Sequence, residues 1–246
     1  MAEPFNLAEF AYAHRGLWRP EGPPENSLSA CLAAAEAGFG IEFDIRPSAE
    51  GEPVIFHDPT LERMTGVSGR IEEKTLNTLE TLSLKQSTDT IISLTTLLTA
   101  WPATTPLLCE LKIDGQTDPE QFAEQVGKTL MAYRGPAAAM SFSIAAVRAL
   151  PKTLMRGQLI PPRNLADGKP FQTTLESLHE TKPDYLAPHT SDARVVSQQA
   201  ERLGLPCFVW TVTDAGMMQD MRAVSDAQIF ENIETEMVKT ISGSKL

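Results

Sequence analysis

Cysteines and long apolar runs are scarce in this chain of 246 residues. The three cysteines, Cys31, Cys109 and Cys207, are an odd number and widely spaced, which is not typical of a disulfide framework. No apolar run approaches the roughly 20 residues that a membrane-spanning helix needs. The acidic start, Met1-Ala2-Glu3-Pro4, lacks the basic and apolar regions of a signal peptide. These absences predict a cytoplasmic protein with no stable membrane anchor.

Basic residues are also in the minority, because 21 Lys and Arg stand against 32 Asp and Glu, for a formal net charge of −11. Nucleic acids and anionic membranes bind to basic surfaces, so neither is an expected partner. The overall field also does not steer a small anionic substrate inward. Any such attraction must come from a metal ion or a few local cations. The oligomeric state, a homo-oligomer included, stays open.

The C-terminus carries one short motif with a cellular meaning. Ser244-Lys245-Leu246 match a peroxisomal address. The match is short and nothing else in the sequence marks a eukaryotic source, so whether it is a targeting signal stays open.

Strand-length and helix-length segments alternate along the chain, and counting them gives eight strand–helix units. Parallel strands with crossover helices explain the alternation. Eight units in about 250 residues favour a closed (β/α)8 TIM barrel, an α/β fold, over an open doubly wound sheet. No Gly-rich phosphate fingerprint follows the first strand, which argues against a dinucleotide-binding fold. The expected strands are 10–15, 40–47, 106–112, 138–142, 154–160, 184–188, 207–212 and 228–230, and the expected helices are 28–37, 94–101, 119–133, 144–150, 171–181, 194–203, 215–224 and 235–241.

One stretch interrupts this regular pattern. Residues 53–56 run extended after the second strand, and from residue 59 to residue 93 Thr, Ser, Gly and Glu dominate. We interpret 59–93 as a small insertion with short helices inside a single domain, residues 1–246.

The second expected strand, Gly40-Ile41-Glu42-Phe43-Asp44-Ile45-Arg46-Pro47, carries two carboxylates two residues apart. Side chains alternate across a strand, so Glu42 and Asp44 emerge on the same face. Carboxylates this close repel each other unless a cation lies between them or one of them takes a proton. An all-oxygen pair suits Mg²⁺ or Ca²⁺. The alternative is an amphipathic edge strand whose carboxylates face water.

Glu110 and Lys112 repeat this spacing in the third expected strand. In a barrel, active-site residues lie at the carboxyl ends of the strands. Ionisable side chains that point into a barrel are costly unless they serve one another or a ligand, so their convergence indicates a site. The ends of the expected strands and the segments just after them carry His14, Arg15, Glu42, Asp44, His57, Glu110, Lys112 and Trp210.

Five short motifs stand in order along the chain: His14-Arg15-Gly16, Glu25-Asn26-Ser27, Glu42-x-Asp44, the His57-Asp58 that follows Gly51-x-Pro53-Val54, and Glu110-Leu111-Lys112. Together they resemble the glycerophosphodiester phosphodiesterase family. The likeness is strongest over residues 10–72 and 106–112, and it resumes at Ser141-Phe142 and Trp210-Thr211-Val212. The resemblance implies a (β/α)8 barrel with a small insertion after the second strand. It also implies metal-dependent hydrolysis of glycerophosphodiesters to glycerol 3-phosphate and an alcohol.

The resemblance also implies a role for each matched residue. Glu42, Asp44 and Glu110 are the expected ligands of the divalent cation, Mg²⁺ or Ca²⁺. His14 and His57 match the family's acid/base pair, which suits displacement at phosphorus because one group must accept a proton and another must donate one. Motif order and family likeness favour His14 as the base and His57 as the acid, and the reverse assignment stays open. The other matched positions are Arg15 and Lys112 on the phosphate oxygens, Glu25 behind the site or hydrogen-bonded to the substrate, and Trp210 in the pocket wall.

The sequence departs from the family pattern at a few places. Ser27 replaces the usual Thr, Glu50 stands where Asp is usual before Gly51, and Thr213 stands where Asn is common. The eighth expected strand lacks the usual Gly-Ile-Ile-Thr-Asp pattern and instead reads Ala227-Gln228-Ile229-Phe230-Glu231-Asn232. These differences affect the substrate pocket more than the chemistry.

Two other functions stay open beside hydrolysis of a small phosphodiester substrate. The same barrel could act on a lysophospholipid or a phosphoinositide, although the acidic composition and the lack of a basic patch argue against membrane-bound substrates. It could also be a non-catalytic barrel that binds phosphodiesters. The presence of both His14 and His57 argues against this second alternative, because a binding protein needs no proton acceptor and donor.

Four further residues of reactive types have simpler interpretations. His179 lies on the polar face of an expected helix and should be solvated. His189 ends the sixth strand, where a structural role is favoured over contact with substrate. Cys109 and Cys207 are expected to pack in the core rather than to act as nucleophiles.

Overall fold

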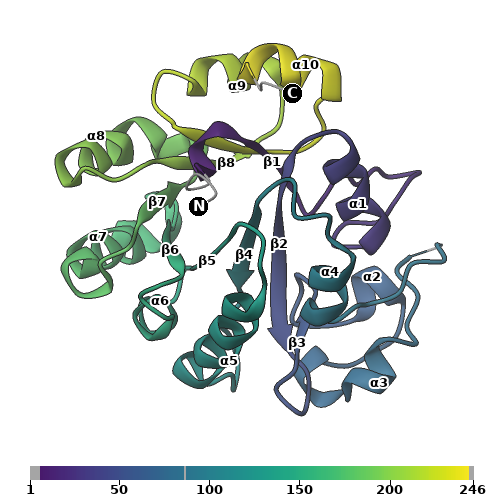
Figure 1. Cartoon of the computed structure of the whole chain (residues 1–246). Helices are drawn as coiled ribbons and strands as arrows, with labels where there is room; N and C mark the ends of the chain where they lie inside the picture. The colour runs from purple at the N-terminus through teal and green to yellow at the C-terminus, as the bar shows by residue number, and fades with distance from the viewer. Residues whose placement is uncertain (1–5, 86, 244–246) are drawn as a thin grey trace.

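Eight parallel strands enclose the centre of the molecule in the computed structural model, which describes residues 6–85 and 87–243 (Figure 1). Their hydrogen bonds link neighbours that are mostly consecutive in the chain, as in a barrel. The strands are β1 (Ala11–His14), β2 (Gly40–Pro47), β4 (Leu107–Leu111), β5 (Ala137–Ser141), β6 (Met155–Ile160), β7 (Tyr185–Pro188), β8 (Phe208–Val212) and β9 (Ala227–Phe230).

The order of the strands decides between a barrel and an open sheet. It runs β7-β6-β5-β4-β2-β1-β9-β8, so β7 and β8 are the two ends of the ladder. Two parallel bridges, Leu186 with Cys207 and His189 with Trp210, join these ends. The sheet is therefore a nearly closed barrel, and the prediction of a (β/α)8 fold is confirmed.

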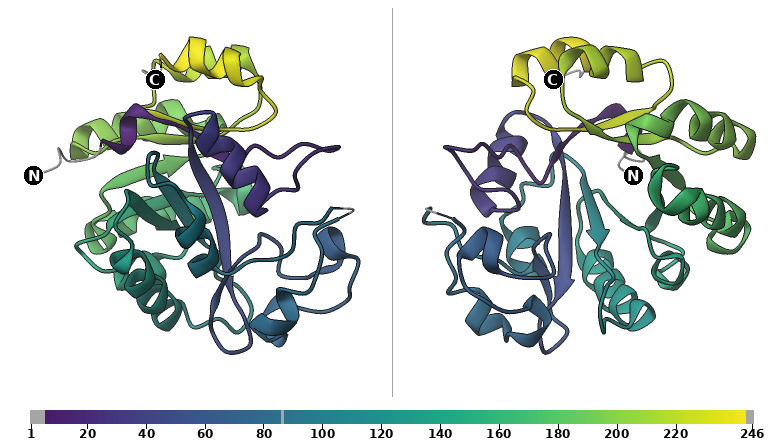
Figure 2. Two further views of the ribbon diagram at one scale, coloured as in Figure 1. Left: turned by 45° about the vertical axis from the view of Figure 1, so that its right-hand side comes forward. Right: turned by 180° about the vertical axis from the view of Figure 1, so that it is seen from behind.

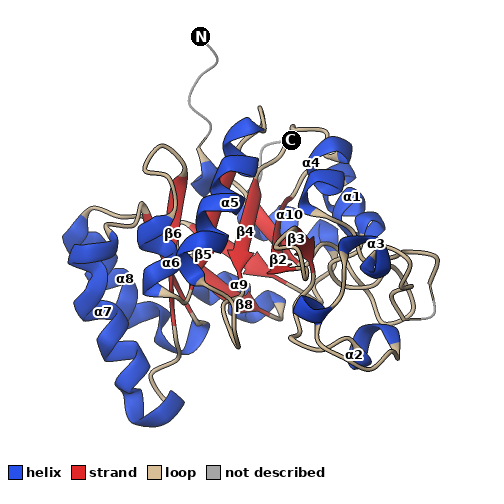
Figure 3. Ribbon diagram, turned by 90° about the horizontal axis from the view of Figure 1, so that it is seen from below, coloured by secondary structure: helices blue, strands red, loops and turns tan. Residues whose placement is uncertain are grey.

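A ring of helices covers the outside of the barrel, with one member of the ring between each strand and the next parallel strand and one after the last (Figures 1 and 3). This is the alternation that the sequence predicts. The helices are α1 (Leu28–Glu36), α4 (Leu94–Ala100), α5 (Pro119–Ala132), α6 (Ile144–Ala149), α7 (Lys169–Thr181), α8 (Ala193–Leu203), α9 (Ala215–Met221) and α10 (Thr235–Ser242).

Side-chain caps set where several of these helices begin. The Ser27 hydroxyl accepts a hydrogen bond from the backbone N–H of Ala30 and so caps α1, and Ser93 and Ser143 cap α4 and α6 in the same way. Helix α9 is shorter than predicted and ends at Met221 rather than near residue 224. The Met221 carbonyl accepts hydrogen bonds from the N–H of Val224 and the hydroxyl of Ser225, which close a turn there.

Two apolar clusters form most of the core, one outside the ring of strands and one inside it. The larger cluster lies between the strands and the helices and includes Phe39, Phe43 and Leu107. The smaller cluster is built from side chains on the alternate strand positions, among them Tyr12, Leu108, Tyr185 and Phe208. The Phe208 ring stacks on Tyr185 at 4.6 Å and on Tyr12 at 6.0 Å between ring centroids. Since strand side chains alternate, this cluster is the floor of the barrel interior below the predicted site.

Residues 59–93 extend from the barrel beside β3 (Pro53–Ile55), which pairs antiparallel with β2 (Figure 2). Their short elements are α2 (Glu62–Thr65), η2 (Ile71–Glu73) and α3 (Leu76–Leu79). A separate apolar cluster that includes Phe56, Leu61, Met64 and Ile71 packs the segment together. The remaining short 3-10 helices are η1 (Leu7–Glu9), η3 (Leu165–Gly168) and η4 (Thr190–Asp192).

The structure bears on three further predictions from the sequence, which concern the cysteines, membrane-spanning helices and the C-terminal motif. Cys31, Cys109 and Cys207 are buried free thiols, so the packing role predicted for the last two is confirmed. Within residues 6–85 and 87–243, we find no helix with the length and apolar character to cross a membrane. The Ser244-Lys245-Leu246 motif and the Met1–Pro4 start lie outside the described residues.

Gly16 closes the first site motif and lets α1 pack directly against it. Its φ is +81°, in the left-handed region, and a Cβ there would lie 2.6 Å from the Ala30 carbonyl carbon. We expect Gly16→Ala to lower the free energy of unfolding by about 2–5 kcal/mol, the sum of left-handed strain and overpacking. Urea unfolding measures the loss.

Gly66 provides the matched control for Gly16. Its φ is +72°, and a Cβ there would meet nothing within 4 Å. Gly66→Ala should therefore lose only the conformational part, about 1–2 kcal/mol. Equal losses in the two variants would show that contact with α1 does not matter.

Candidate active site

The residues predicted from the sequence come together at the carboxyl ends of the strands. His14 ends β1 and pairs in register with Glu42 of β2, while Asp44 pairs in register with Glu110 of β4. Lys112 follows β4 directly, and Trp210 lies in β8. This is the end of a (β/α)8 barrel where active sites lie.

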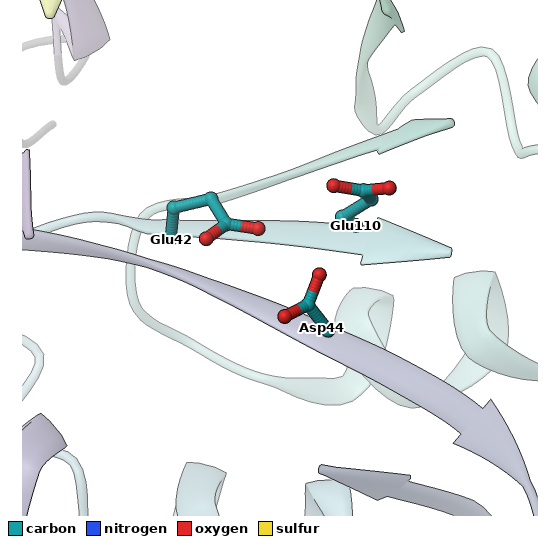
Figure 4. Close-up of side chains that lie close together, drawn as sticks. All are labelled: Glu42, Asp44 and Glu110. Atoms are coloured by element: carbon teal, nitrogen blue, oxygen red, sulfur yellow. The ribbon is translucent and has the colours of Figure 1, made fainter. Parts of the chain in front are cut away.

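Three carboxylates form the centre of this site. Glu42, Asp44 and Glu110 point toward one another (Figure 4), and each offers an oxygen within 4.8 Å of the others. All three are buried, with 1%, 0% and 7% of their surfaces exposed. Glu42 Oε1 is buried and has no hydrogen-bond partner among the residues that the structure describes. An unpartnered buried carboxylate oxygen is costly, and a hard cation with oxygen ligands would satisfy it.

The three carboxyl groups differ in their electrostatic environment. Burial raises the pKa of Glu42, and the negative charges of Asp44 and Glu110 raise it further. Burial also raises the pKa of Glu110, although Lys112 opposes this. Burial acts on Asp44 in the same direction, but Lys112 and Arg15 outweigh it and hold the pKa of Asp44 well below its usual range. Asp44 is therefore ionised, and the other two carboxylates gain most from a bound cation.

Two cations already lie against the carboxylates. Lys112 Nζ is 2.6 Å from Glu110 Oε1 and 2.9 Å from Asp44 Oδ1. Arg15 Nε is 3.2 Å from Asp44 Oδ2. Arg15 has a φ of 59°, and its backbone N–H donates to the backbone carbonyl of Glu42 at 2.7 Å. A non-glycine residue in this left-handed conformation is strained, and such strain is concentrated at functional sites.

Asn26 fixes the orientation of Asp44. Its side-chain amide donates to Asp44 Oδ2 at 2.9 Å, and its side-chain oxygen accepts from the Asp44 N–H at 3.2 Å. Asn26 directly precedes Ser27, the residue that caps α1, and does not cap the helix itself. Asn26 instead adopts a φ of 58° and holds the carboxylate.

Each predicted catalytic histidine has its own carboxylate partner. His14 Nδ1 lies 2.7 Å from Glu231 Oε2, and His57 Nδ1 lies 2.7 Å from Asp58 Oδ1. The backbone of His57 is held as well, because buried Arg46 donates from Nε to the His57 carbonyl at 2.7 Å. These contacts leave Nε2 of each ring for other partners, and Nε2 of His14 faces the carboxylate cluster, 3.8 Å from Glu42 Oε2.

Glu25 lies between two arginines rather than free in the pocket. Its Oε1 is 2.7 Å from Arg15 NH1, and Arg63 donates to both of its oxygens at 2.7 and 2.8 Å. Burial alone would raise the pKa of Glu25, but the hydrogen bonds from Arg63 and the charge of Arg15 lower it. Of the two alternatives for Glu25, these contacts favour a position behind the site.

An aromatic wall stands on the β7–β8 side of the mouth. Trp210 donates from Nε1 to the Ala187 carbonyl at 2.7 Å and meets the rings of Phe142 and His189 edge to face, at 5.5 and 5.1 Å between centroids. His189 also bonds to Ser191 Oγ at 2.9 Å, which agrees with a structural role. His179 lies outside this region and its side chain is 76% exposed, as predicted.

A cavity of about 120 Å³ opens beside the carboxylates. It extends along the ends of β4 and β5, so a molecule in it would contact both the carboxylate cluster and part of the aromatic wall. Its lining includes Arg46, Glu110, Lys112, Asp114, Ser141 and Phe142.

Four residues without a predicted role in the site contact the predicted ones: Asn26, Asp58, Arg63 and Glu231. Glu231 directly follows the last strand, so the rule on strand ends could have found it. Asp58 adjoins His57 in its motif. Asn26 adjoins Glu25 in its motif, and Arg63 lies in a stretch of the sequence where no periodicity marks it.

Several solved structures share the fold. A glycerophosphodiester phosphodiesterase from Thermotoga maritima is 24% identical with a TM-score of 0.74, and the match covers 93% of this chain and 95% of that one. An Oleispira antarctica phosphodiesterase in complex with the product sn-glycerol-3-phosphate is 24% identical with a TM-score of 0.79, over 94% and 96% of the two chains. At this identity the likeness shows the fold.

Sequence relatives match over shorter stretches. Glycerophosphodiester phosphodiesterase 1 of Rattus norvegicus is 40% identical over 74 residues, which are 30% of this chain and 22% of that protein. The glycerophosphodiester phosphodiesterase of Caldanaerobacter subterraneus is 37% identical over 71 residues, 28% of each chain. The model of the glycerophosphoryl diester phosphodiesterase family matches residues 14–232. The chain therefore belongs to the glycerophosphoryl diester phosphodiesterase family.

Proposed function

We propose that this protein is a metal-dependent phosphodiesterase that hydrolyses small glycerophosphodiesters to glycerol 3-phosphate and an alcohol. Family membership and the names of its relatives support this substrate class, and the Oleispira antarctica enzyme contains sn-glycerol-3-phosphate. Three buried free thiols also suit a reducing compartment, so we propose a cytoplasmic location.

One observation carries the proposal: three buried carboxylates, one with an unpartnered oxygen, lie in reach of two cations. Glu42, Asp44 and Glu110 would hold Mg²⁺ or Ca²⁺, since their donor set is all oxygen. The bound ion would supply positive charge that stabilises negative charge developing on the phosphoryl oxygens. Lys112 and Arg15 would bind the non-bridging oxygens of the phosphate, Arg15 through its planar fork of N–H groups.

The two histidines would move the protons. His14 takes a proton from the attacking oxygen through Nε2, and Glu231 on Nδ1 stabilises the imidazolium that forms. That oxygen forms a new bond to phosphorus, the bond from phosphorus to the alcohol oxygen breaks, and His57 protonates the departing alkoxide. Burial lowers the pKa of His57, as do the charges of Lys112 and Arg15, although Asp44 opposes them. The negative phosphate of the substrate offsets these cations and favours the protonated ring.

Metal dependence is the first test of this proposal. EDTA should abolish turnover of a panel of glycerophosphodiesters, and Mg²⁺ or Ca²⁺ should restore it. The ion should also raise the melting temperature, because it binds the folded state. Glu42→Gln should lose this response and melt no lower than wild type in EDTA, since it removes a buried charge that Asp44 and Glu110 repel.

Glu124→Gln is the matched control, since Glu124 is exposed on α5. It should keep wild-type turnover and the wild-type response to the ion. Full activity of wild-type enzyme shown by elemental analysis to be metal-free would contradict the proposal. A panel on which only lysophospholipids or phosphoinositides turn over would select that alternative substrate class. Binding without turnover would indicate a non-catalytic barrel.

The roles of the two histidines can be separated by changing the leaving group. His57→Ala should lose about 10²–10⁴-fold in rate on a glycerol–alkyl diester, whose alkoxide needs a proton. It should lose distinctly less on a nitrophenyl diester, because nitrophenolate leaves without that help. His14→Ala should lose activity on both substrates alike.

Either of two results would change this assignment. Rescue of His14→Ala and not of His57→Ala by the nitrophenyl substrate would exchange the two roles. Equal and severe losses of both variants on both substrates would mean that the histidines act as one unit.

We also propose that the insertion, residues 59–93, selects the alcohol. It begins directly after His57 and Asp58 and leaves from the mouth of the barrel, where loops shape the pocket. A variant shortened within this segment, with His57, Asp58 and Arg63 retained, should change the ranking of alcohols in kcat/KM. If a folded variant ranked the alcohols in the same order, the segment would have only a structural role.

A further inference from the structure

All three nitrogens of the Arg63 guanidinium donate hydrogen bonds to two carboxylates, those of Asp58 and Glu25. Nε lies 2.5 Å from Asp58 Oδ2 and NH2 lies 2.9 Å from Asp58 Oδ1. NH1 donates to Glu25 Oε2 at 2.8 Å, and NH2 donates also to Glu25 Oε1 at 2.7 Å. The side chain is 43% exposed, so it lies at the surface above the site and not in the core.

Each of these carboxylates also contacts a residue of the site. Asp58 Oδ1 is 2.7 Å from His57 Nδ1. Glu25 Oε1 is 2.7 Å from Arg15 NH1, and Arg15 in turn reaches Asp44. Arg63 is thus one carboxylate away from the expected general acid on one side and from an expected phosphate ligand on the other.

The insertion fixes the place from which Arg63 reaches. Its neighbours Leu61 and Met64 are buried in the insertion's own apolar cluster, while Arg63 points to the barrel. Both oxygens of Glu25 and both oxygens of Asp58 accept from the Arg63 guanidinium, so the contacts fix the orientation of each carboxylate as well as adding to stability. Only arginine offers a rigid fork that can donate to two carboxylates at once.

We propose that Arg63 is a positioning residue that aligns His57, through Asp58, and Arg15, through Glu25, for reaction with the phosphodiester. The inference rests on the proposed function of the site. It gives the insertion a part in the chemical step as well as in the choice of alcohol. Residues that orient a catalytic group in this way typically contribute about 10- to 100-fold to activity or affinity.

The first experiment compares Arg63→Met, Arg63→Lys and Arg148→Met. Arg148 is a surface arginine of α6 that pairs only with Glu120 among the described residues, at 2.7 Å, and that lies outside the cavity lining and the carboxylate cluster. Arg63→Met should lower kcat about 10- to 100-fold with a smaller change in KM. Arg63→Lys should recover part of the loss, because it restores the charge without the fork. Arg148→Met should keep the wild-type kcat.

The second experiment asks whether Arg63 acts through its two partners. If it does, Arg63→Met combined with Asp58→Asn, or with Glu25→Gln, should lose less than the product of the two single losses. A nitrophenyl diester should recover only the part that passes through Asp58 and His57. Losses that multiply in both combinations would contradict the inference.

A readout without turnover separates this inference from the proposed function. In ¹⁵N-labelled wild-type protein, the ring nitrogens of His57 should show one tautomer with Nδ1 protonated toward Asp58. Arg63→Met should shift these signals toward a mixture of tautomers, and Arg148→Met should not. Unchanged His57 signals together with an unchanged kcat would overturn the inference. A wild-type protein that turns over no diester would contradict the proposed function, and the His57 signals would still decide the inference.

Discussion

The rest of the site depends on the mutual repulsion of three carboxylates held in the barrel. Glu42, Asp44 and Glu110 offer oxygens within 4.8 Å of one another and are almost fully buried. With an effective dielectric constant of about 20, each ionised pair at that distance costs about 3 kcal/mol. Arg15 and Lys112 offset part of this cost, and both lie in ion contact with Asp44. Glu42 Oε1 is left without a hydrogen bond from the described residues, and it is the oxygen that would gain most from a metal ion.

The chain places each cationic or titratable group of the site against a carboxylate. His14 pairs with Glu231, His57 with Asp58, Arg15 with Glu25 and Lys112 with Glu110. The partners come from strands, loops and the insertion, so the pairs tie separate parts of the fold to one mouth. This pairing explains how a protein of net charge −11 can still present cations to an anionic substrate. The attraction is local, because it comes from a few oriented N–H groups rather than from the overall field.

The parts of the site that the sequence predicts are those that follow from strand geometry. Glu42, Asp44, Glu110 and Lys112 are recognisable because polar residues two apart share one face, and parallel strands bring their ends together. Strand register then places Asp44 beside Glu110, as observed. Arg63 could not be found in this way. It lies in α2, 38 residues from Glu25, and the apolar cluster of the insertion packs α2 where Arg63 reaches that carboxylate.

The residues below the carboxylates in the barrel interior affect how strongly the carboxylates attract a cation. Below them lies the floor cluster, in which Tyr12, Tyr185 and Phe208 stack and exclude water. Gly40, two residues before Glu42 on the same face, leaves the space that the Tyr12 ring occupies, since a Cβ there would lie 2.6 Å from it. The rings of this floor provide little solvent screening, and the Tyr12 hydroxyl donates to the Leu7 carbonyl rather than to a carboxylate, so the floor raises the cost of unpaired charge above it. The floor raises the free-energy cost of the ionised carboxylates. It therefore also strengthens their attraction for any cation that enters from the open end of the barrel.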